Sequence, residues 1–372
     1  MARLGGRIAR PDGSLLRGFV SFGQRIVAVE PSERAGDDYI LPGFIDLQVN
    51  GSHGVDVMTA SADDLLRISK NLAAEGTTAW LATAITSPLD RIERANRIID
   101  EAMTEQGANA GADSGASILG MHLEGPFISP HRLGAHPKLT LEPAGEALER
   151  VLALNRLRLL TLAPELPSAF DAIQRLCARG VVVSIGHSDA TLEQAEAGVA
   201  AGARMFTHLF NAMRPMRHRD PGVAAAALLG SAAKPAVIPD AVHVHPAMLR
   251  LVYRLRGAAG LILTTDKIGL ADAPGASTTL GGVHIKVDGG AARLDDGTLA
   301  GSIISMLDGV RVMVEEAGVT PGEAARMAAG NPAAILSLGD RGKIEPGARA
   351  DLIVLDPGLD LKAVFVTGRE TR

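Results

Sequence analysis

The sequence predicts an α/β protein: a (β/α)8 barrel of the TIM type with a small β-sandwich domain formed from both chain ends. Three observations support this fold class. Eight short apolar runs alternate with helical patterns over about 300 residues. Four side chains of metal-binding type follow separate runs, as catalytic residues do in such barrels. Both chain ends show strand-like alternation. We expect residues 1–42 plus 341–372 to form the β domain and 43–340 the barrel.

The small domain is predicted from alternating apolar and polar residues at both ends of the chain. Residues 1–40 alternate in this way, with turn signals at 11–13 and 23–24. Residues 341–357 have the same character. Neither end is large enough to bury a core alone, so the two ends are expected to pair.

The barrel is predicted from buried parallel strands, which read as continuous apolar runs. Helical patterns lie between most of these runs. A doubly wound sheet is the alternative, but candidate ligands spread over four strands favour a closed barrel. The strands are expected at 43–50, 77–83, 118–124, 157–163, 181–187, 205–210, 236–244 and 261–266, with helices such as 63–75, 90–104, 169–179 and 191–203.

An insertion at residues 129–143 follows the third strand candidate. It carries His131, Arg132, His136 and Lys138, and we expect it to lie over the mouth of the barrel, at the catalytic face.

Composition limits the function classes. Hydrophobic residues make up 47% of the 372 residues, which is enough for a large core, and the net charge is −5. No basic block is present, so a nucleic-acid partner is not expected. No apolar run reaches the about 18–20 residues of a membrane span, and no signal peptide is seen, so a cytoplasmic protein is expected. The single Cys177 excludes an intramolecular disulfide and a cysteine-rich zinc site.

Glu124, His187 and His208 each follow an apolar run and are the candidate metal ligands. Catalytic zinc typically takes three protein ligands from His, Glu or Asp and keeps one position for water. For any one of these histidines, a hydrogen-bonded core residue is the ordinary alternative. Their common position at strand ends favours a metal centre for the set.

Asp266 ends the eighth run and is the candidate general base. A carboxylate beside an activated water can take its proton and then pass it to a leaving amine. The alternatives are a helix N-cap or one half of a buried ion pair.

Several motifs, in order along nearly the whole chain, resemble the amidohydrolase superfamily and, within it, the N-acetylglucosamine-6-phosphate deacetylase family. The more specific ones are His-Leu-Glu-Gly-Pro at 122–126 and Thr-His-Leu-Phe-Asn-Ala-Met at 207–213. Pro-Gly-Phe-Ile-Asp at 42–46 and Ala-Asp-Leu at 350–352 indicate the superfamily alone. The other matching segments are 134–136, 161–165, 185–188, 219–222, 243–245 and 265–266.

The resemblance implies one divalent metal ion per subunit, with Zn²⁺ expected. Many amidohydrolases begin with His-x-His on strand one, where period two turns both imidazoles toward a second metal. Gln48 and Asn50 occupy those positions here, and amides are weak zinc ligands, so a second site is expected to be absent. Glu124 replaces the carboxylated lysine of binuclear relatives.

The resemblance also implies a substrate site for a phosphorylated N-acetyl amino sugar. Asn211, the Ala212 backbone and Arg219 are expected to bind the phosphate. His243 matches a histidine supplied across a homodimer interface. His136 matches one that contacts the substrate amide or sugar hydroxyls and is expected, with the metal, to polarise the acetamide carbonyl as a catalytic residue. Independently, the basic residues at 214–219 suit a polyanion, although a solvated loop would look the same.

Three segments depart from the family pattern, at 239–241, 267–271 and 301–305, and leave the exact sugar open. The expected reaction is hydrolysis of the acetamide of N-acetylglucosamine 6-phosphate. The alternatives are deacetylation of a related substrate such as N-acetylgalactosamine 6-phosphate, or a catalytically silent binding protein of the same fold.

Overall fold

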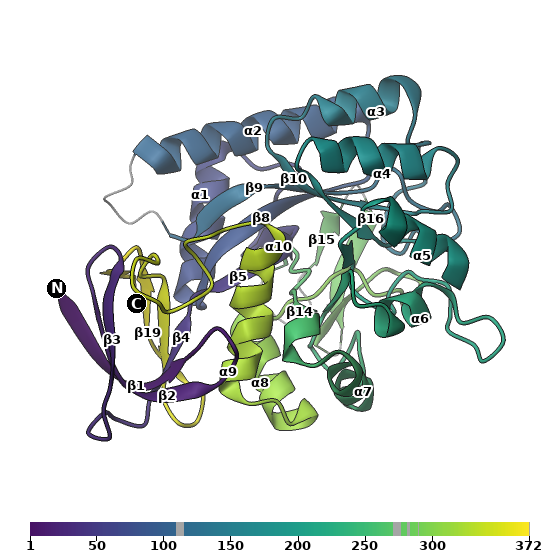
Figure 1. Ribbon diagram of the computed structural model, residues 1–372. Helices are drawn as coiled ribbons and strands as arrows, with labels where there is room; N and C mark the ends of the chain where they lie inside the picture. The colour runs from purple at the N-terminus through teal and green to yellow at the C-terminus, as the bar shows by residue number, and fades with distance from the viewer. Residues whose placement is uncertain (109–114, 271–276, 281–282, 289, 372) are drawn as a thin grey trace.

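In the computed structural model, eight parallel strands form one sheet in consecutive order, which gives the predicted (β/α)8 barrel (Figure 1). The structure describes residues 1–108, 115–270, 277–280, 283–288 and 290–371. The barrel strands are β5 Phe44–Val49, β8 Thr77–Ile85, β9 Ser117–Glu124, β10 Leu157–Leu162, β11 Val182–Ile185, β12 Met205–Phe206, β13 Lys234–Val237 and β14 Ile262–Leu263.

The seam between β14 and β5 closes without a regular ladder. An isolated parallel bridge joins Val49 to Lys267, and the Asn50 amide donates to the Lys267 carbonyl at 2.7 Å. Below this bridge, the buried Asp46 carboxylate on β5 accepts hydrogen bonds from the hydroxyls of Thr264 and Thr265. Side chains therefore complete the closure that two-residue β14 cannot make alone.

Helices alternate with the strands and pack against one another around the sheet (Figure 1). Ser61 and Thr191 begin two of them with capping boxes. Among the described residues, no helix combines the length and apolar composition needed to cross a membrane. The helices are α1 Ala62–Ala74, α2 Leu89–Ala108, α3 Gly145–Leu152, α4 Ala169–Ala178, α5 Leu192–Ala201, α6 Gly222–Leu229, α7 Pro246–Arg256, α8 Met306–Ala317, α9 Pro321–Ala325 and α10 Asn331–Ile335, with the short helices η1 Ala258–Gly260 and η2 Arg326–Gly330.

Strands from both chain ends share a seven-stranded sheet with the order β20-β19-β18-β4-β1-β2-β3. Its core includes Phe22 and Phe365, whose rings meet edge to face at 5.2 Å. The domain boundaries stated above stay a prediction. The strands are β1 Ala2–Ala9, β2 Leu15–Phe22, β3 Ile26–Pro31, β4 Tyr39–Pro42, β18 Leu352–Leu355, β19 Leu361–Val366 and β20 Arg369–Glu370.

The last three barrel strands are shorter than the sequence predicts. The predicted strands 205–210, 236–244 and 261–266 end at Phe206, Val237 and Leu263. The backbone turns soon after each strand, with positive φ at His208, Ala241 and Asp266. The sequence analysis also missed the hairpin of β6 Gly51–Ser52 with β7 Val55–Asp56, and the three-stranded sheet of β15 Ser277–Leu280, β16 Val283–Asp288 and β17 Ala291–Arg293.

Candidate metal centre and active site

The four predicted metal-centre residues meet at the carboxyl edge of the barrel. Glu124 is the last residue of β9, and His187 and His208 are each the second residue after their strands. Asp266 is the third residue after β14. The last three have positive φ, 48° for His187, 27° for His208 and 53° for Asp266. Non-glycine residues with such values cluster at functional sites, where surrounding contacts hold the strained backbone.

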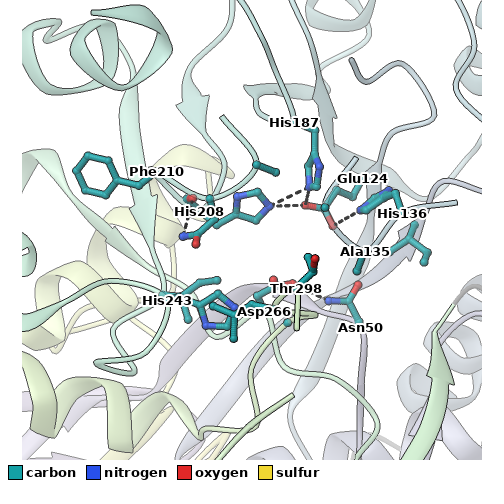
Figure 2. Close-up of a pocket in the computed structure, with 17 residues that line it drawn as sticks. Asn50, Glu124, Ala135, His136, His187, His208, Phe210, His243, Asp266 and Thr298 are labelled. Carbon is teal, nitrogen blue, oxygen red and sulfur yellow. Dashed lines mark hydrogen bonds and ion pairs between the residues drawn. The ribbon is translucent and has the colours of Figure 1, made fainter. Parts of the chain in front are cut away.

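Three ligand atoms converge on one point between β9, β11 and β12 (Figure 2). Glu124 Oε1 lies 3.2 Å from His187 Nε2 and 3.0 Å from His208 Nε2, and the two Nε2 atoms are 3.1 Å apart. Ligands about 2.0–2.1 Å from a tetrahedral zinc ion would be about 3.4 Å apart. The observed triangle is close to that size.

The tautomer of His187 makes this cluster fit a cation. His187 Nδ1 lies 2.9 Å from the Arg132 carbonyl oxygen, which can only accept, so Nδ1 carries the proton and Nε2 presents a lone pair. That lone pair faces a carboxylate oxygen and a second imidazole nitrogen. A carboxylate oxygen and two imidazole nitrogens this close together form a group that could bind a divalent metal ion.

Burial and mutual contacts shift the pKa values of the cluster. Burial raises the pKa of Glu124, but its contacts with His136, His187 and His208 outweigh burial and hold that pKa well below its usual range. Burial and the neighbouring His136 lower the pKa of His187 to about 4. Burial also acts to lower the pKa of His208, yet its contacts with Glu124 leave it raised. His187 is therefore neutral at pH 7, as a metal ligand must be.

His136, from the insertion after β9, completes the cluster on the other carboxylate oxygen. Its Nε2 lies 3.3 Å from Glu124 Oε2, and its Nδ1 lies 2.8 Å from Thr86 Oγ1. His136, Glu124 and His187 also lie within metal-ligand reach of one another. The triangle of Glu124, His187 and His208 differs in that both imidazoles contact the same carboxylate oxygen, Glu124 Oε1.

Asp266 is held by two amides from β5. Gln48 and Asn50 donate to Asp266 Oδ1 at 2.9 and 2.7 Å, and Gln48 also donates to Glu124 Oε1 at 2.8 Å. Gln48 and Asn50 occupy the positions where a His-x-His motif would bind metal. In this chain their side-chain amides donate hydrogen bonds to carboxylates instead. Burial and repulsion from Glu124 raise the pKa of Asp266 to about 7, although nearby imidazoles and Asn50 oppose the shift.

A cavity of about 290 Å³ opens onto this cluster (Figure 2). The turn after β12 forms one wall, where Asn211 donates to the carbonyls of His208 and Leu209. Eight of the nine predicted site residues line the cavity: Glu124, His136, His187, His208, Asn211, Ala212, His243 and Asp266. The ninth, Arg219, is exposed and does not line it.

His243 lines the pocket of its own chain. Its expected contribution across a dimer interface stays a prediction. Its Nδ1 lies 2.6 Å from Asp240 Oδ2, and its backbone amide donates to Asp240 Oδ1. Asp240 is anionic, because these hydrogen bonds and the charge of His243 outweigh burial and lower its pKa. Asp240, on the loop after β13, therefore holds the His243 imidazole in the cavity wall.

Two other lining residues, Thr298 and Leu299, were missed because no motif marks them. Thr298 and Leu299 follow β17 and reach the mouth from far along the chain. Gly134, from the matching segment 134–136, has φ +55°, a backbone conformation that favours glycine, and lies beside His187 Cε1.

Comparison with known proteins places the chain in a family. The model of the Amidohydrolase family matches residues 39–371, which is most of the chain. The chain belongs to the amidohydrolase family. Membership agrees with the buried Glu/His/His group, because the family is metal-dependent.

Three relatives of this amidohydrolase bear on its substrate. It is 40% identical to the N-acetylglucosamine-6-phosphate deacetylase of Lysinibacillus sphaericus, over 89% of this chain and 85% of that one. It is 37% identical to the N-acetylgalactosamine-6-phosphate deacetylase of Escherichia coli O157:H7, over 92% of both chains. A mutant N-acetyl-D-glucosamine-6-phosphate deacetylase from Mycobacterium smegmatis, solved with N-acetyl-D-glucosamine-6-phosphate, superposes with a TM-score of 0.89 at 33% identity, covering 99% of this chain and 98% of that one.

Proposed function

We propose that this amidohydrolase removes the acetyl group of N-acetyl-D-glucosamine 6-phosphate, giving acetate and D-glucosamine 6-phosphate. The observation that carries the proposal is one cavity that joins the Glu124–His187–His208 triangle to a buried carboxylate, Asp266, with a pKa of about 7. The names of its relatives, and the sugar phosphate bound in the Mycobacterium smegmatis structure, support the substrate.

We propose Zn²⁺ as the ion that Glu124, His187 and His208 hold. Two imidazoles and one carboxylate are a ligand set of catalytic zinc. When bound, such an ion supplies water activation near neutral pH and polarises a carbonyl group. The hydrogen bond from Gln48 to Glu124 orients the carboxylate in the way that outer partners of metal ligands usually do.

Asp266 carries the proton. Both amide donors reach Oδ1, and among the described residues none donates to Oδ2, which leaves that oxygen for water. Asp266 takes a proton as the water oxygen adds to the acetamide carbon. It then gives this proton to the sugar nitrogen as the C–N bond breaks. His136, fixed by Thr86, stands beside the reacting carbonyl and stabilises its negative charge.

The far wall of the cavity is the proposed phosphate site. Asn211, the Ala212 backbone and His243 line it and offer N–H donors. Ala212 has φ +48°, a turn conformation that exposes backbone groups. Arg219 lies exposed on the loop that continues from Ala212 and does not line the cavity, so its phosphate contact stays a prediction.

We also propose that the enzyme is a homodimer. Support comes from apolar side chains exposed on the two loops that line the cavity: Met216, four residues after Ala212, is 46% exposed, and Val242, next to His243, is 40% exposed. Light scattering at micromolar concentration tests this directly. A mass of one chain would contradict it.

The proposed reaction is tested by acetate release from three substrates, with added zinc and with chelator. Fast, chelator-sensitive release from N-acetylglucosamine 6-phosphate, and much slower release from unphosphorylated N-acetylglucosamine, is expected. N-acetylgalactosamine 6-phosphate is the third arm, since one relative carries that name. Preference for it would replace the glucosamine assignment, and no release from any of the three by zinc-loaded enzyme would overturn the proposal.

A further inference from the structure

The insertion after β9 is tied to one metal ligand, His187, by its backbone. The Ser129 amide donates to the His187 carbonyl at 2.9 Å. In the other direction, His187 Nδ1 donates to the Arg132 carbonyl, also at 2.9 Å. The second contact decides which ring nitrogen of His187 is free to bind metal.

The side chain of Arg132 returns to the same turn. Its Nε and Nη2 lie 2.8 and 2.6 Å from Asp189 Oδ1, and Asp189 is two residues after His187. The contacts form a closed ring. It runs from His187 along the chain to Asp189, across the ion pair to Arg132, and through the Arg132 carbonyl back to the imidazole.

Asp189 is the fixed side of this ring. Its backbone amide donates to Glu165 Oε1 at 2.6 Å, and Ser188 Oγ donates to Glu165 Oε2 at 2.7 Å. Arg214 donates to the Asp189 carbonyl at 3.1 Å. Arg132, by contrast, lies in a segment without helix or strand. The ion pair therefore fastens an irregular loop to an anchored turn.

We propose that Arg132 and Asp189 are positioning residues that set the metal affinity of His187, through the carbonyl that fixes its tautomer and ring orientation. The inference rests on the proposed metal site but not on the proposed substrate. Partners that orient a metal ligand typically contribute about 10–100-fold to metal affinity. An ion pair whose two side chains are each 29% exposed contributes little to global stability, so metal affinity and stability can be measured separately.

The test measures zinc affinity of the metal-free protein by competition with a chromophoric chelator. Asp189→Asn and Arg132→Met should each weaken zinc binding about 10–100-fold. The double variant should lose no more than either single variant, because both changes break one ring. Asp189→Glu keeps the charge and should restore part of the affinity.

A matched control is Asp100→Asn, which breaks the Arg156–Asp100 pair, whose side chains are similarly exposed at 35% and 37% and lie outside the cavity. It should leave zinc affinity unchanged, and the melting temperatures of all metal-free variants should stay close to wild type. Zinc affinity of Asp189→Asn within threefold of wild type would overturn the inference. If the zinc affinities of wild type, variants and control follow these expectations but the wild-type protein releases no acetate, the proposed function alone is overturned.

Discussion

At the residue scale, Asp266 shows how environment sets the chemistry of one side chain. Its carboxyl group is buried beside Glu124, and both effects disfavour its charge. The amides of Gln48 and Asn50 favour the charge again, through two hydrogen bonds to one oxygen. The resulting pKa of about 7 suits a group that must accept and then release a proton near neutral pH.

This pKa predicts the acid limb of the pH profile. A base acts only when deprotonated, so kcat/KM should fall about tenfold per pH unit below the pKa of Asp266. A cation beside Glu124 lowers that pKa, which places the limb at or below pH 7. Initial rates from pH 5 to 8 measure it.

Asp266→Asn is the control for this profile. It should lower kcat by about 10²–10⁴-fold and keep bound zinc, because Asp266 is outside the ligand triangle. Turnover close to wild type, or a wild-type kcat/KM that is equal at pH 5 and pH 8, would contradict the base assignment.

The convergence of the candidate site residues on one cavity could be predicted from the sequence, but their contacts could not. Glu124 and His187 were recognisable because each follows an apolar run. The roles of Arg132 and Asp189 were not, since an ion pair between residues 57 apart in sequence leaves no periodic signal. Gln48 and Asn50 were recognised as poor metal ligands, whereas their bonds to Asp266 required the three-dimensional register of β5 against β14.

At the element scale, the seam of the barrel is where its weakest ladder lies. Lys267 follows Asp266, bridges to Val49 and extends its side chain to Glu75, the C-cap of α1. Its Nζ is 2.7 and 2.9 Å from the two Glu75 oxygens. The side chain of Lys267 is 2% exposed and that of Glu75 is 21% exposed. One buried ion pair thus joins the turn after β14 to helix α1.

Lys267→Met is expected to destabilise the protein by about 3 kcal/mol, because it leaves the largely buried Glu75 carboxylate without its lysine and with the His53 imidazole 3.7 Å away. The double change Lys267→Met with Glu75→Gln removes both charges and should recover part of this loss. Urea unfolding of the single and double variants measures both values. A single variant as stable as wild type would show that the pair contributes nothing to the seam.

Strand existence was easier to predict than strand length. Continuous apolar runs identify β8 and β9 with nearly correct ends. Runs at 205–210 and 261–266 contain residues that leave the strand at positive φ, and apolar composition alone does not reveal where this happens. The sheet of β15–β17 was missed because the sequence analysis identified no strand between the eighth apolar run at 261–266 and residue 341.

At the scale of the whole molecule, the terminal sheet and the barrel share one continuous stretch of chain. β4 leads into β5 through Gly43, whose amide donates to the Asp351 carbonyl beside β18. Alternation at both chain ends was enough to predict that they pair, because neither end could bury a core alone. The order of strands within the sheet, with β4 between β1 and β18, was not deducible from that pattern.

Cation binding should stabilise the molecule as a whole. Zinc at 100 times its Kd adds about 2.7 kcal/mol. At about 2.1 cal/mol/K per residue, the 372 residues have an unfolding entropy of about 0.8 kcal/mol/K, so Tm should rise by about 3 °C. Differential scanning calorimetry measures the shift. His208→Ala should abolish it, and an equal shift in that variant would place the ion elsewhere.

The shared terminal sheet has a consequence for how the protein is made. On a ribosome, β4 emerges at Pro42, but its partner β18 begins at Leu352, about 310 residues later. At about 5–20 residues per second, the nascent strands wait about 15–60 s for that partner. During this interval one edge of β4 is unpaired and open to misassociation. Nascent chains arrested before Leu352 should therefore bind holdase chaperones that the released protein does not.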